Sequence, residues 1–215
     1  MWRGAIKGHL LESAEVTRRT AEVCVPDIER AVRTIAECFR KGGSLLLCGN
    51  GGSAADCQHI ATELKSTLRR DFVRPALSAI ALTTDTSFLT ASANDFGFEG
   101  VFARQVEALG RPGDVLMGIS TSGNSANILR AVERARELRL SVIGLTGSDG
   151  GSLGKCCDIA IRVPSVDVQH IQEAHIAIGH ALCLLTESLL FGGRRVDTGG
   201  DGISSEPPRS GFTGS

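Results

Sequence analysis

Short apolar runs alternate with helical segments along most of this chain, and this alternation is the feature that most constrains its fold. The runs that read as strands are 44–48, 76–82, 114–119, 141–146 and 157–163. Each is nearly continuous in apolar residues, which is typical of strands buried on both faces of a parallel sheet. We therefore predict an α/β fold in which helices cover both sides of a parallel sheet.

Helical periodicity fills the segments around these runs. Two helical patterns occupy residues 5–41, and further helices are predicted at about 53–66, 101–109, 125–137 and 169–190. The chain from 1 to 192 is expected to form a single domain with an N-terminal helical extension. Residues 193–215 are rich in Gly, Ser and Pro with few large apolar residues, so we expect a flexible tail.

The composition argues against several classes of function. The 215 residues carry 23 basic and 24 acidic side chains, a net charge of −1 that gives no general attraction to nucleic acid or to anionic membranes. No apolar run is expected to reach membrane-spanning length, and the N-terminus lacks the apolar core of a signal peptide. The seven cysteines form no C-x-x-C pair. A cytoplasmic protein with reduced thiols is therefore expected.

A serine-rich loop lies between the third predicted strand and the helix that follows it. Its hydroxyl groups come from Ser120, Thr121, Ser122 and Ser125. At a helix N-terminus, hydroxyls and unpaired N–H groups make a site that favours an anion such as phosphate. The loop has no lysine, so it does not match the nucleotide P-loop. It points to a phosphorylated small molecule; the alternative is that the hydroxyls only cap the helix.

A glycine-rich turn follows the first predicted strand. Residues 49–54 match G-x-G-x-x-A, the weak form of a dinucleotide fingerprint, which also needs an acid closing the second strand. Asp71 precedes that strand and Asp85 follows it, so neither fits, and we expect no nucleotide cofactor. The glycines still allow a ligand to approach the backbone, and Ser53 could add a phosphate contact.

Histidines and acidic side chains occur on two of the predicted helices. His59 and Glu63 stand four residues apart and share a helix face. The alternative is that they are an incidental polar pair on a solvent-exposed face, which is the commoner case for such a pair alone. The last helix carries His175 and His180 within a mostly apolar segment, where a lone histidine is more often a core residue. Two histidine-bearing helices in one small domain make a shared acid–base or metal site a reasonable hypothesis.

Four stretches together resemble the sugar-isomerase (SIS) domain proteins, and among them the phosphoheptose isomerases. They are GNGGSAADCQHIATEL, ALTTDTSFLTASANDFGFE, GDVLMGISTSGNSANI and IQEAHIAIGHALC, and with their spacing they cover roughly residues 30–192. The resemblance implies a three-layer α/β/α sandwich of flavodoxin-like type. It also implies a homotetramer whose active sites are built between subunits.

The resemblance assigns roles residue by residue. Glu63 matches the catalytic base and His180 its acid–base partner. The positions that match sugar-phosphate contacts are Ser53, Ser120, Thr121, Ser122 and Ser125. Other substrate-binding positions are matched by Asn50, Gly51, Gly52, Glu63, Asn94, Asp95 and Gln172. The zinc ligands of some family members are matched by His59, Glu63, Gln172 and His180. Because the segment before the last helix varies within the family, Asp167 and His170 receive no role.

The activity that the resemblance implies is the conversion of D-sedoheptulose 7-phosphate to D-glycero-D-manno-heptose 7-phosphate through an enediol. This reaction opens the synthesis of nucleotide-activated heptose for lipopolysaccharide or other surface glycans. Two alternatives stay open: a non-catalytic SIS protein that binds a replication initiator, and an isomerase of another phosphosugar such as a pentose phosphate. Retention of Glu63 and His180 favours the heptose isomerase.

Overall fold

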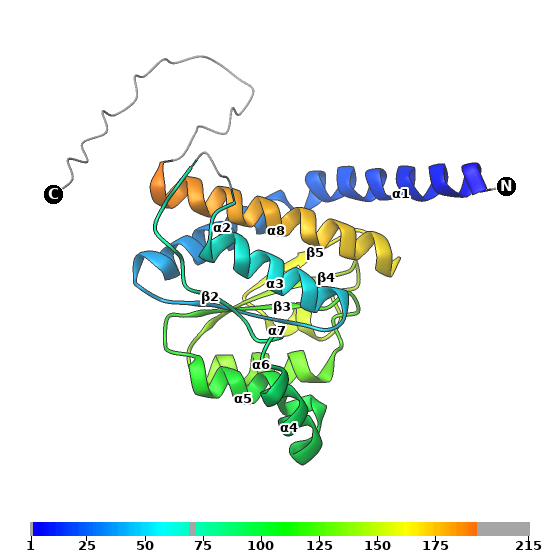
Figure 1. Ribbon diagram of the computed structural model, residues 1–215. Coiled ribbons are helices and arrows are strands. Elements are labelled where there is room, and N and C mark those ends of the chain that lie inside the picture. The colour runs from blue at the N-terminus through cyan, green and yellow to red at the C-terminus, as the bar shows by residue number, and fades with distance from the viewer. Residues whose placement is uncertain (1, 69–71, 193–215) are drawn as a thin grey trace.

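A five-stranded parallel sheet forms the centre of the computed structural model, which describes residues 2–68 and 72–192 (Figure 1). The strands are β1 (Leu45–Gly49), β2 (Ala79–Ala81), β3 (Val115–Ile119), β4 (Ser141–Thr146) and β5 (Ile159–Arg162). Their order is β2-β1-β3-β4-β5, the doubly wound flavodoxin-like order. The predicted parallel sheet is confirmed, although β2 is shorter than expected. The predicted tail, 193–215, lies outside the described residues.

Helices cover both faces of this sheet. One layer holds α2 (Val25–Arg40), α3 (Gly52–Lys65) and α8 (Val168–Phe191), and α1 (Trp2–Val23) packs on α2 and α8. The opposite layer holds α4 (Thr86–Phe96), α5 (Val101–Leu109), α6 (Ala126–Glu137) and α7 (Leu153–Cys156), with a short 3-10 turn, η1 (Phe98–Gly100). Figure 1 shows the two layers above and below the strands, which confirms the three-layer sandwich.

Successive residues of a strand contribute to two separate apolar cores, one on each face of the sheet. On β1, Leu45 and Leu47 face the core under α2, α3 and α8, whereas Leu46 and Cys48 face the core above α5 and α6. All five residues of β1 and all five of β3 are buried, because side chains alternate across a sheet that is covered on both faces. This double burial explains why the strands read as continuous apolar runs.

The two N-terminal helices differ in how deeply they are buried. Ile35 and Cys38 of α2 are buried in the same core as the sheet, so α2 belongs to the covering layer. Among the helices and strands that the structure describes, α1 is the one that extends away from the body, with its N-terminal end projecting beyond the sandwich (Figure 1). Its periodic apolar residues therefore need a different explanation from those of α2.

Helix α4 has no counterpart among the helices expected from the sequence. Only Ser92 is buried along it, so no apolar stripe with helical spacing marks the segment. The helix begins instead at a polar cap, where the Asp85 carboxylate accepts a hydrogen bond from the Phe88 backbone N–H at 2.9 Å. A local cap of this kind gives a weaker sequence signal than a buried face does.

Helix α8 corrects the expectation that no run is long enough for a membrane. Its 24 residues are long and apolar enough to cross one by length and composition, and 44% of its most apolar window is buried in the protein. Ile171, Ile178 and Leu182 contribute to the core beneath the sheet. The apolar composition of α8 is thus used in packing against the sheet and α3.

His175 is buried in α8, and we therefore expect the stability of the fold to fall at acidic pH. Burial lowers its pKa to about 4, and the carbonyl oxygen of Thr146, 3.2 Å from Nε2, opposes that shift only in part. The neutral ring is favoured in the folded protein, whereas the unfolded chain takes up a proton below about pH 6.5. Unfolding free energy should therefore fall by about 2–3 kcal/mol between pH 7.5 and 4.5 from this residue alone.

Urea unfolding of the wild type and of His175→Gln across this range measures that contribution. The difference between the two pH profiles isolates His175 from other titrating groups. Parallel profiles would show that His175 does not carry the effect.

Candidate active site

The two loops singled out in the sequence lie side by side at the carboxyl edge of the sheet. The glycine-rich turn follows β1 and the serine-rich loop follows β3, and these strands are neighbours paired from Leu45–Val115 to Gly49–Ile119. From β1 the chain turns to β2 on one side, and β3 lies on the other side. This reversal of strand order is the topological switch point, where open α/β sheets bind their ligands.

Two asparagine side chains join the loops directly. Asn50 donates to the carboxamide oxygen of Asn127 at 3.0 Å, and Asn127 donates back to Asn50 at 2.8 Å. Asn127 is buried in the first turn of α6. Sequence reasoning placed Asn50 in the site through its backbone and missed Asn127, whose role depends on a partner 77 positions away.

Hydroxyl groups of the serine-rich loop face one another. The Ser120 Oγ lies 3.1 Å from the Ser125 Oγ and 3.5 Å from the Ser122 Oγ. Ser125 occupies the N-cap position of α6, yet its side chain makes no capping hydrogen bond. The hydroxyls are therefore gathered above the helix N-terminus, an arrangement that favours anion binding over simple capping.

Gly123 allows this loop to pack tightly. Its φ is +66°, and a Cβ there would lie 2.1 Å from the carbonyl oxygen of Gly150. Only glycine accommodates both the left-handed backbone and this close approach. The serine-rich loop is thus held against the loop that follows β4.

Helices α3 and α8 bring together His59, Glu63 and His180. The Nε2 atoms of His59 and His180 lie 2.8 Å apart, and the His59 Nε2 lies 3.6 Å from Glu63 Oε1. The two histidines are exposed, while the Glu63 side chain is 19% exposed. The two helices expected to share a site thus meet at these side chains.

The second carboxylate oxygen of Glu63 is buried and has no hydrogen-bond partner among the described residues. Buried polar atoms are nearly always satisfied, so an orphaned carboxylate oxygen indicates a ligand, a water or a catalytic role. Imidazole and carboxylate groups are ligand types that zinc uses, so His59, Glu63 and His180 agree in residue type with the metal that the resemblance implies. Zinc binding at this position stays a prediction.

Gln172, in the second turn of α8, lies against the first turn of α3. A Cβ on Gly52 would lie 1.6 Å from the Gln172 Nε2, so the carboxamide covers the first turn of α3. Eight positions separate Gln172 from His180, about 12 Å along a helix axis. The described contacts place Gln172 at the glycine-rich turn rather than at the histidine pair, and its assignment as a zinc ligand stays a prediction.

Arg74 fixes the end of α3 that carries Glu63, and sequence reasoning missed it. Its guanidinium donates to the backbone carbonyls of Glu63 and Leu64 at 2.8 and 2.7 Å, and to Glu187 Oε2 of α8 at 2.8 Å. The Arg74 and Glu187 side chains are only 2% and 4% exposed. No local pattern marks Arg74, because all these partners come from other segments.

Asp56 was also missed, although it lies seven residues before Glu63 and shares its side of α3. Burial raises the pKa of this carboxyl, and nearby His59 only partly opposes that shift. Its Oδ2 atom is buried without a partner among the described residues. Two carboxyl groups with orphaned oxygens thus occur on one helix of the site.

Asn94 and Asp95 stand apart from this cluster. They lie on α4, are exposed, and hydrogen bond to each other at 2.9 Å. Within the described part of the chain, no hydrogen bond or ion pair connects them with the loops or with Glu63. Their role in substrate binding stays a prediction.

Comparisons with known proteins agree with this geometry. A model of the SIS domain matches residues 10–147. A phosphoheptose isomerase from Roseiflexus sp. is 54% identical over 179 residues, covering 83% of this chain and 90% of that relative. The structure of a phosphoheptose isomerase from Neisseria gonorrhoeae superposes with a TM-score of 0.82 at 43% identity, covering 87% of this chain and 100% of that one.

A structure of the Francisella tularensis phosphoheptose isomerase gives a TM-score of 0.84 at 40% identity, over 87% of this chain and 99% of that one. Sequence and architecture therefore agree over nearly the whole described chain. This chain belongs to the SIS domain family and, within it, to the phosphoheptose isomerases.

Proposed function

We propose that this chain converts D-sedoheptulose 7-phosphate to D-glycero-D-manno-heptose 7-phosphate. The observation that carries the proposal is the Glu63 carboxylate, held beside the His59–His180 pair with one oxygen unpartnered. The names of the relatives supply the substrate class. Two features of the geometry support it: a carboxylate beside an imidazole pair on α3 and α8, and a loop of hydroxyl groups at the carboxyl edge of the sheet.

The serine-rich loop would bind the phosphate end of the sugar. Hydroxyls of Ser120, Ser122 and Ser125 converge at the N-terminus of α6, where the helix dipole also favours negative charge. Ser53, buried in the first turn of α3, would contribute from the neighbouring loop. Because the open-chain sugar is flexible, anchoring its far end lowers the entropic cost of orienting the reacting carbons.

Proton transfer would occur at the other end of the sugar. Glu63 removes the proton from the carbon next to the carbonyl, and an enediol forms. The same carboxylate returns the proton to the adjacent carbon, while His180 moves the proton between the two oxygens.

The proposal includes a zinc ion at these residues. His59, Glu63 and His180 would hold it, and Gln172 is the fourth ligand that the family resemblance implies. When bound, the metal would polarise the substrate carbonyl and stabilise negative charge on oxygen.

The oligomeric state is part of the proposal. Trp2, Ile6 and Leu10 form a stripe at four-residue spacing on α1, with exposed fractions of 80%, 58% and 62%. A stripe of this kind on a projecting helix favours burial against another copy of the chain. We propose a homotetramer with active sites built between subunits, in which neighbouring chains cover α1.

We place the protein in the cytoplasm, at the first step of nucleotide-activated heptose synthesis for lipopolysaccharide or another surface glycan. A non-catalytic SIS protein that binds a replication initiator would have no use for the Glu63–His180 arrangement. An isomerase of another phosphosugar shares the chemistry, and the relatives named above favour the heptose.

Turnover assays with sedoheptulose 7-phosphate and a pentose 5-phosphate test the proposal directly. We expect the heptulose to react with the higher kcat/KM. Absence of turnover by the folded oligomer, with and without added zinc, would refute the isomerase. A higher kcat/KM for the pentose 5-phosphate would show that the substrate is a pentose phosphate and not the heptulose.

Ser122→Ala tests the phosphate loop separately. Loss of one hydrogen bond to a charged group costs about 1.5–3 kcal/mol, which corresponds to a roughly ten- to hundredfold fall in kcat/KM. Ser87→Ala, which removes an exposed hydroxyl on α4, is the matched control and should leave kcat/KM unchanged. Equal values for both variants would remove Ser122 from the binding site.

A further inference from the structure

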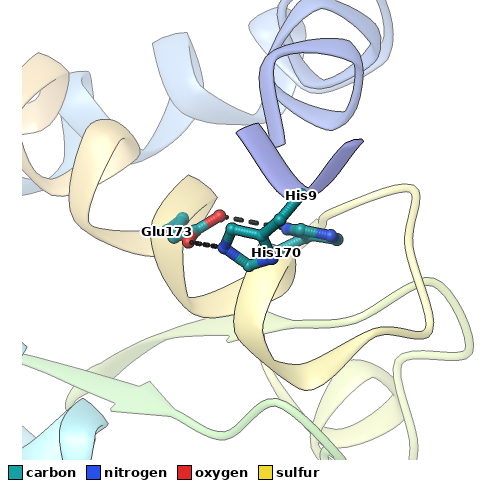
Figure 2. A group of neighbouring side chains, drawn as sticks. All are labelled: His9, His170 and Glu173. Atoms are coloured by element: carbon teal, nitrogen blue, oxygen red, sulfur yellow. Dashed lines mark hydrogen bonds and ion pairs between the residues drawn. The ribbon is translucent and has the colours of Figure 1, made fainter. Parts of the chain in front are cut away.

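A second group of histidines and carboxylates lies outside the candidate active site, where α1 meets the first turns of α8. Of the five histidines in the chain, His59 and His180 form one pair, His175 is buried alone, and His9 and His170 form a second pair. The ring centroids of His9 and His170 are 4.8 Å apart. Figure 2 shows Glu173 reaching between the two rings.

The donor atoms of this second group converge. His9 Nε2 lies 3.3 Å from Glu173 Oε1, and His170 Nδ1 lies 3.1 Å from Glu173 Oε2. The ligand atoms that the three residues can offer all lie within 4.8 Å of one another. Donors around a tetrahedral zinc ion with bonds of about 2.05 Å are separated by roughly 3.3 Å. The two His–Glu173 separations are close to this value, each through a different oxygen of the carboxylate.

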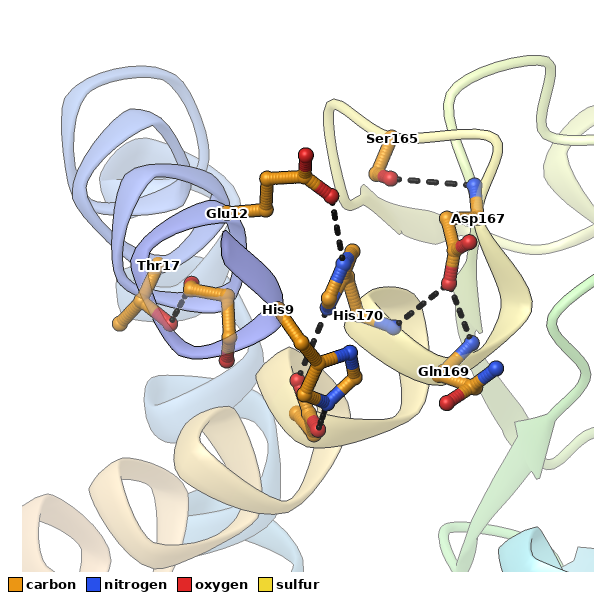
Figure 3. Close-up of polar contacts among 9 residues, drawn as sticks. His9, Glu12, Thr17, Ser165, Asp167, Gln169 and His170 are labelled. Atoms are coloured by element: carbon orange, nitrogen blue, oxygen red, sulfur yellow. Dashed lines mark hydrogen bonds and ion pairs between the residues drawn. The ribbon is translucent and has the colours of Figure 1, made fainter. Parts of the chain in front are cut away.

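A further carboxylate supports the ring of His170 from behind. Its Nε2 lies 3.5 Å from Glu12 Oε2, so one ring nitrogen faces Glu173 while the other faces Glu12 (Figure 3). Metal-bound histidines almost always donate their second N–H to a carboxylate or carbonyl, which orients the ring. The arrangement of Glu12, His170 and Glu173 has this pattern.

The backbone around His170 is also held in place. The Asp167 carboxylate accepts from the backbone N–H groups of Gln169 and His170 at 2.9 and 3.2 Å, which caps the start of α8 (Figure 3). The His170 side chain is only 6% exposed, whereas His9 and Glu173 are 43% and 42% exposed. The cluster thus has a rigid buried ligand and an open side for entry of an ion.

We infer that His9, His170 and Glu173 form a second divalent metal site, suited to zinc, that ties α1 to the start of α8. Two imidazole nitrogens and one carboxylate are a known ligand set for zinc with water in the fourth position. The site lies beside the turn that carries Gln172, so the ion would fix α1 against the helix that contributes to the candidate active site. Its role is structural, and it does not depend on the isomerase activity.

Metal titration of the full chain tests the site. His59→Ala/His180→Ala removes the histidines of the candidate active site, and this background should still bind one Zn²⁺ per chain after chelator treatment, measured by calorimetry. Adding His9→Ala should weaken the remaining binding at least a hundredfold. Adding Glu12→Gln, which removes the supporting carboxylate, should weaken it about 10- to 100-fold.

Glu15→Gln is the matched control, since Glu15 is an exposed carboxylate on α1 that pairs with Arg18. It should leave zinc affinity unchanged. The melting temperature of the background should rise with zinc, and that rise should vanish with His9→Ala. If the double background does not fold, His9→Ala in the otherwise unchanged chain must lower bound zinc by one equivalent. The proposed second site is wrong if the His59→Ala/His180→Ala variant binds no zinc. It is also wrong if His9→Ala leaves the zinc affinity unchanged.

Discussion

Replacing Glu63 with glutamine should lower kcat for the isomerisation by about 10²–10⁴-fold, the usual contribution of a positioned general base. Glutamine keeps the size of the side chain and removes the group that accepts the carbon-bound proton. Its partners, His59 at 3.6 Å and the Arg74 contact to its backbone, do not depend on the charge of the carboxylate for folding. The melting temperature should therefore change little.

Exchange of the substrate C–H proton with deuterated solvent gives the sharper measurement. It should fall in parallel with kcat, because the same carboxylate removes that proton. Glu37→Gln, on the exposed surface of α2, is the matched control and should retain full activity. Undiminished solvent exchange in Glu63→Gln would assign the base to another residue, for which Asp56 is the nearest alternative on α3.

Replacing Arg74 with methionine should have the largest effect on stability. The substitution leaves Glu187 as an uncompensated charge that is 4% exposed, and it removes the donors to the carbonyls of Glu63 and Leu64. Breaking one partner of a buried ion pair costs about 3–5 kcal/mol. Chemical denaturation of the purified protein measures this loss directly.

Two further variants separate the causes of that loss. Arg74→Met/Glu187→Leu removes both charges, so it should recover part of the stability, and the deficit that remains reports on the carbonyls at the end of α3. Arg104→Met breaks only an exposed pair with Glu107 and should cost less than about 1 kcal/mol. An Arg74→Met variant as stable as Arg104→Met would show that the buried pair contributes nothing.

The layers of the fold could be predicted because their signal is local. Leu45 to Cys48 are apolar in succession since both faces of the sheet are covered, and Ile35 and Cys38 mark the buried side of α2. The same reasoning placed both loops at the carboxyl ends of strands. Helix α4 was not predicted because it buries only Ser92 and begins at the polar cap of Asp85.

The site could be predicted only in part. The turn at Asn50 and the hydroxyl groups from Ser120 to Ser125 stood out because they gather more glycines and hydroxyl groups than one turn or helix cap needs. Asn127 and Arg74 did not, since each acts through partners from distant segments. His170 carried no role in the sequence because only the docking of α1 brings His9 and Glu12 to it.

The sequence by itself determined the parallel sheet, the two ligand loops and the residues of the resemblance, because periodicity and composition report which faces are buried. The tertiary structure decided which side chains meet. It set His59 against His180, left one oxygen of Glu63 without a partner, and placed Gln172 over Gly52 instead. Contacts of this kind depend on how helices dock, and docking is fixed by packing between segments that no local pattern records.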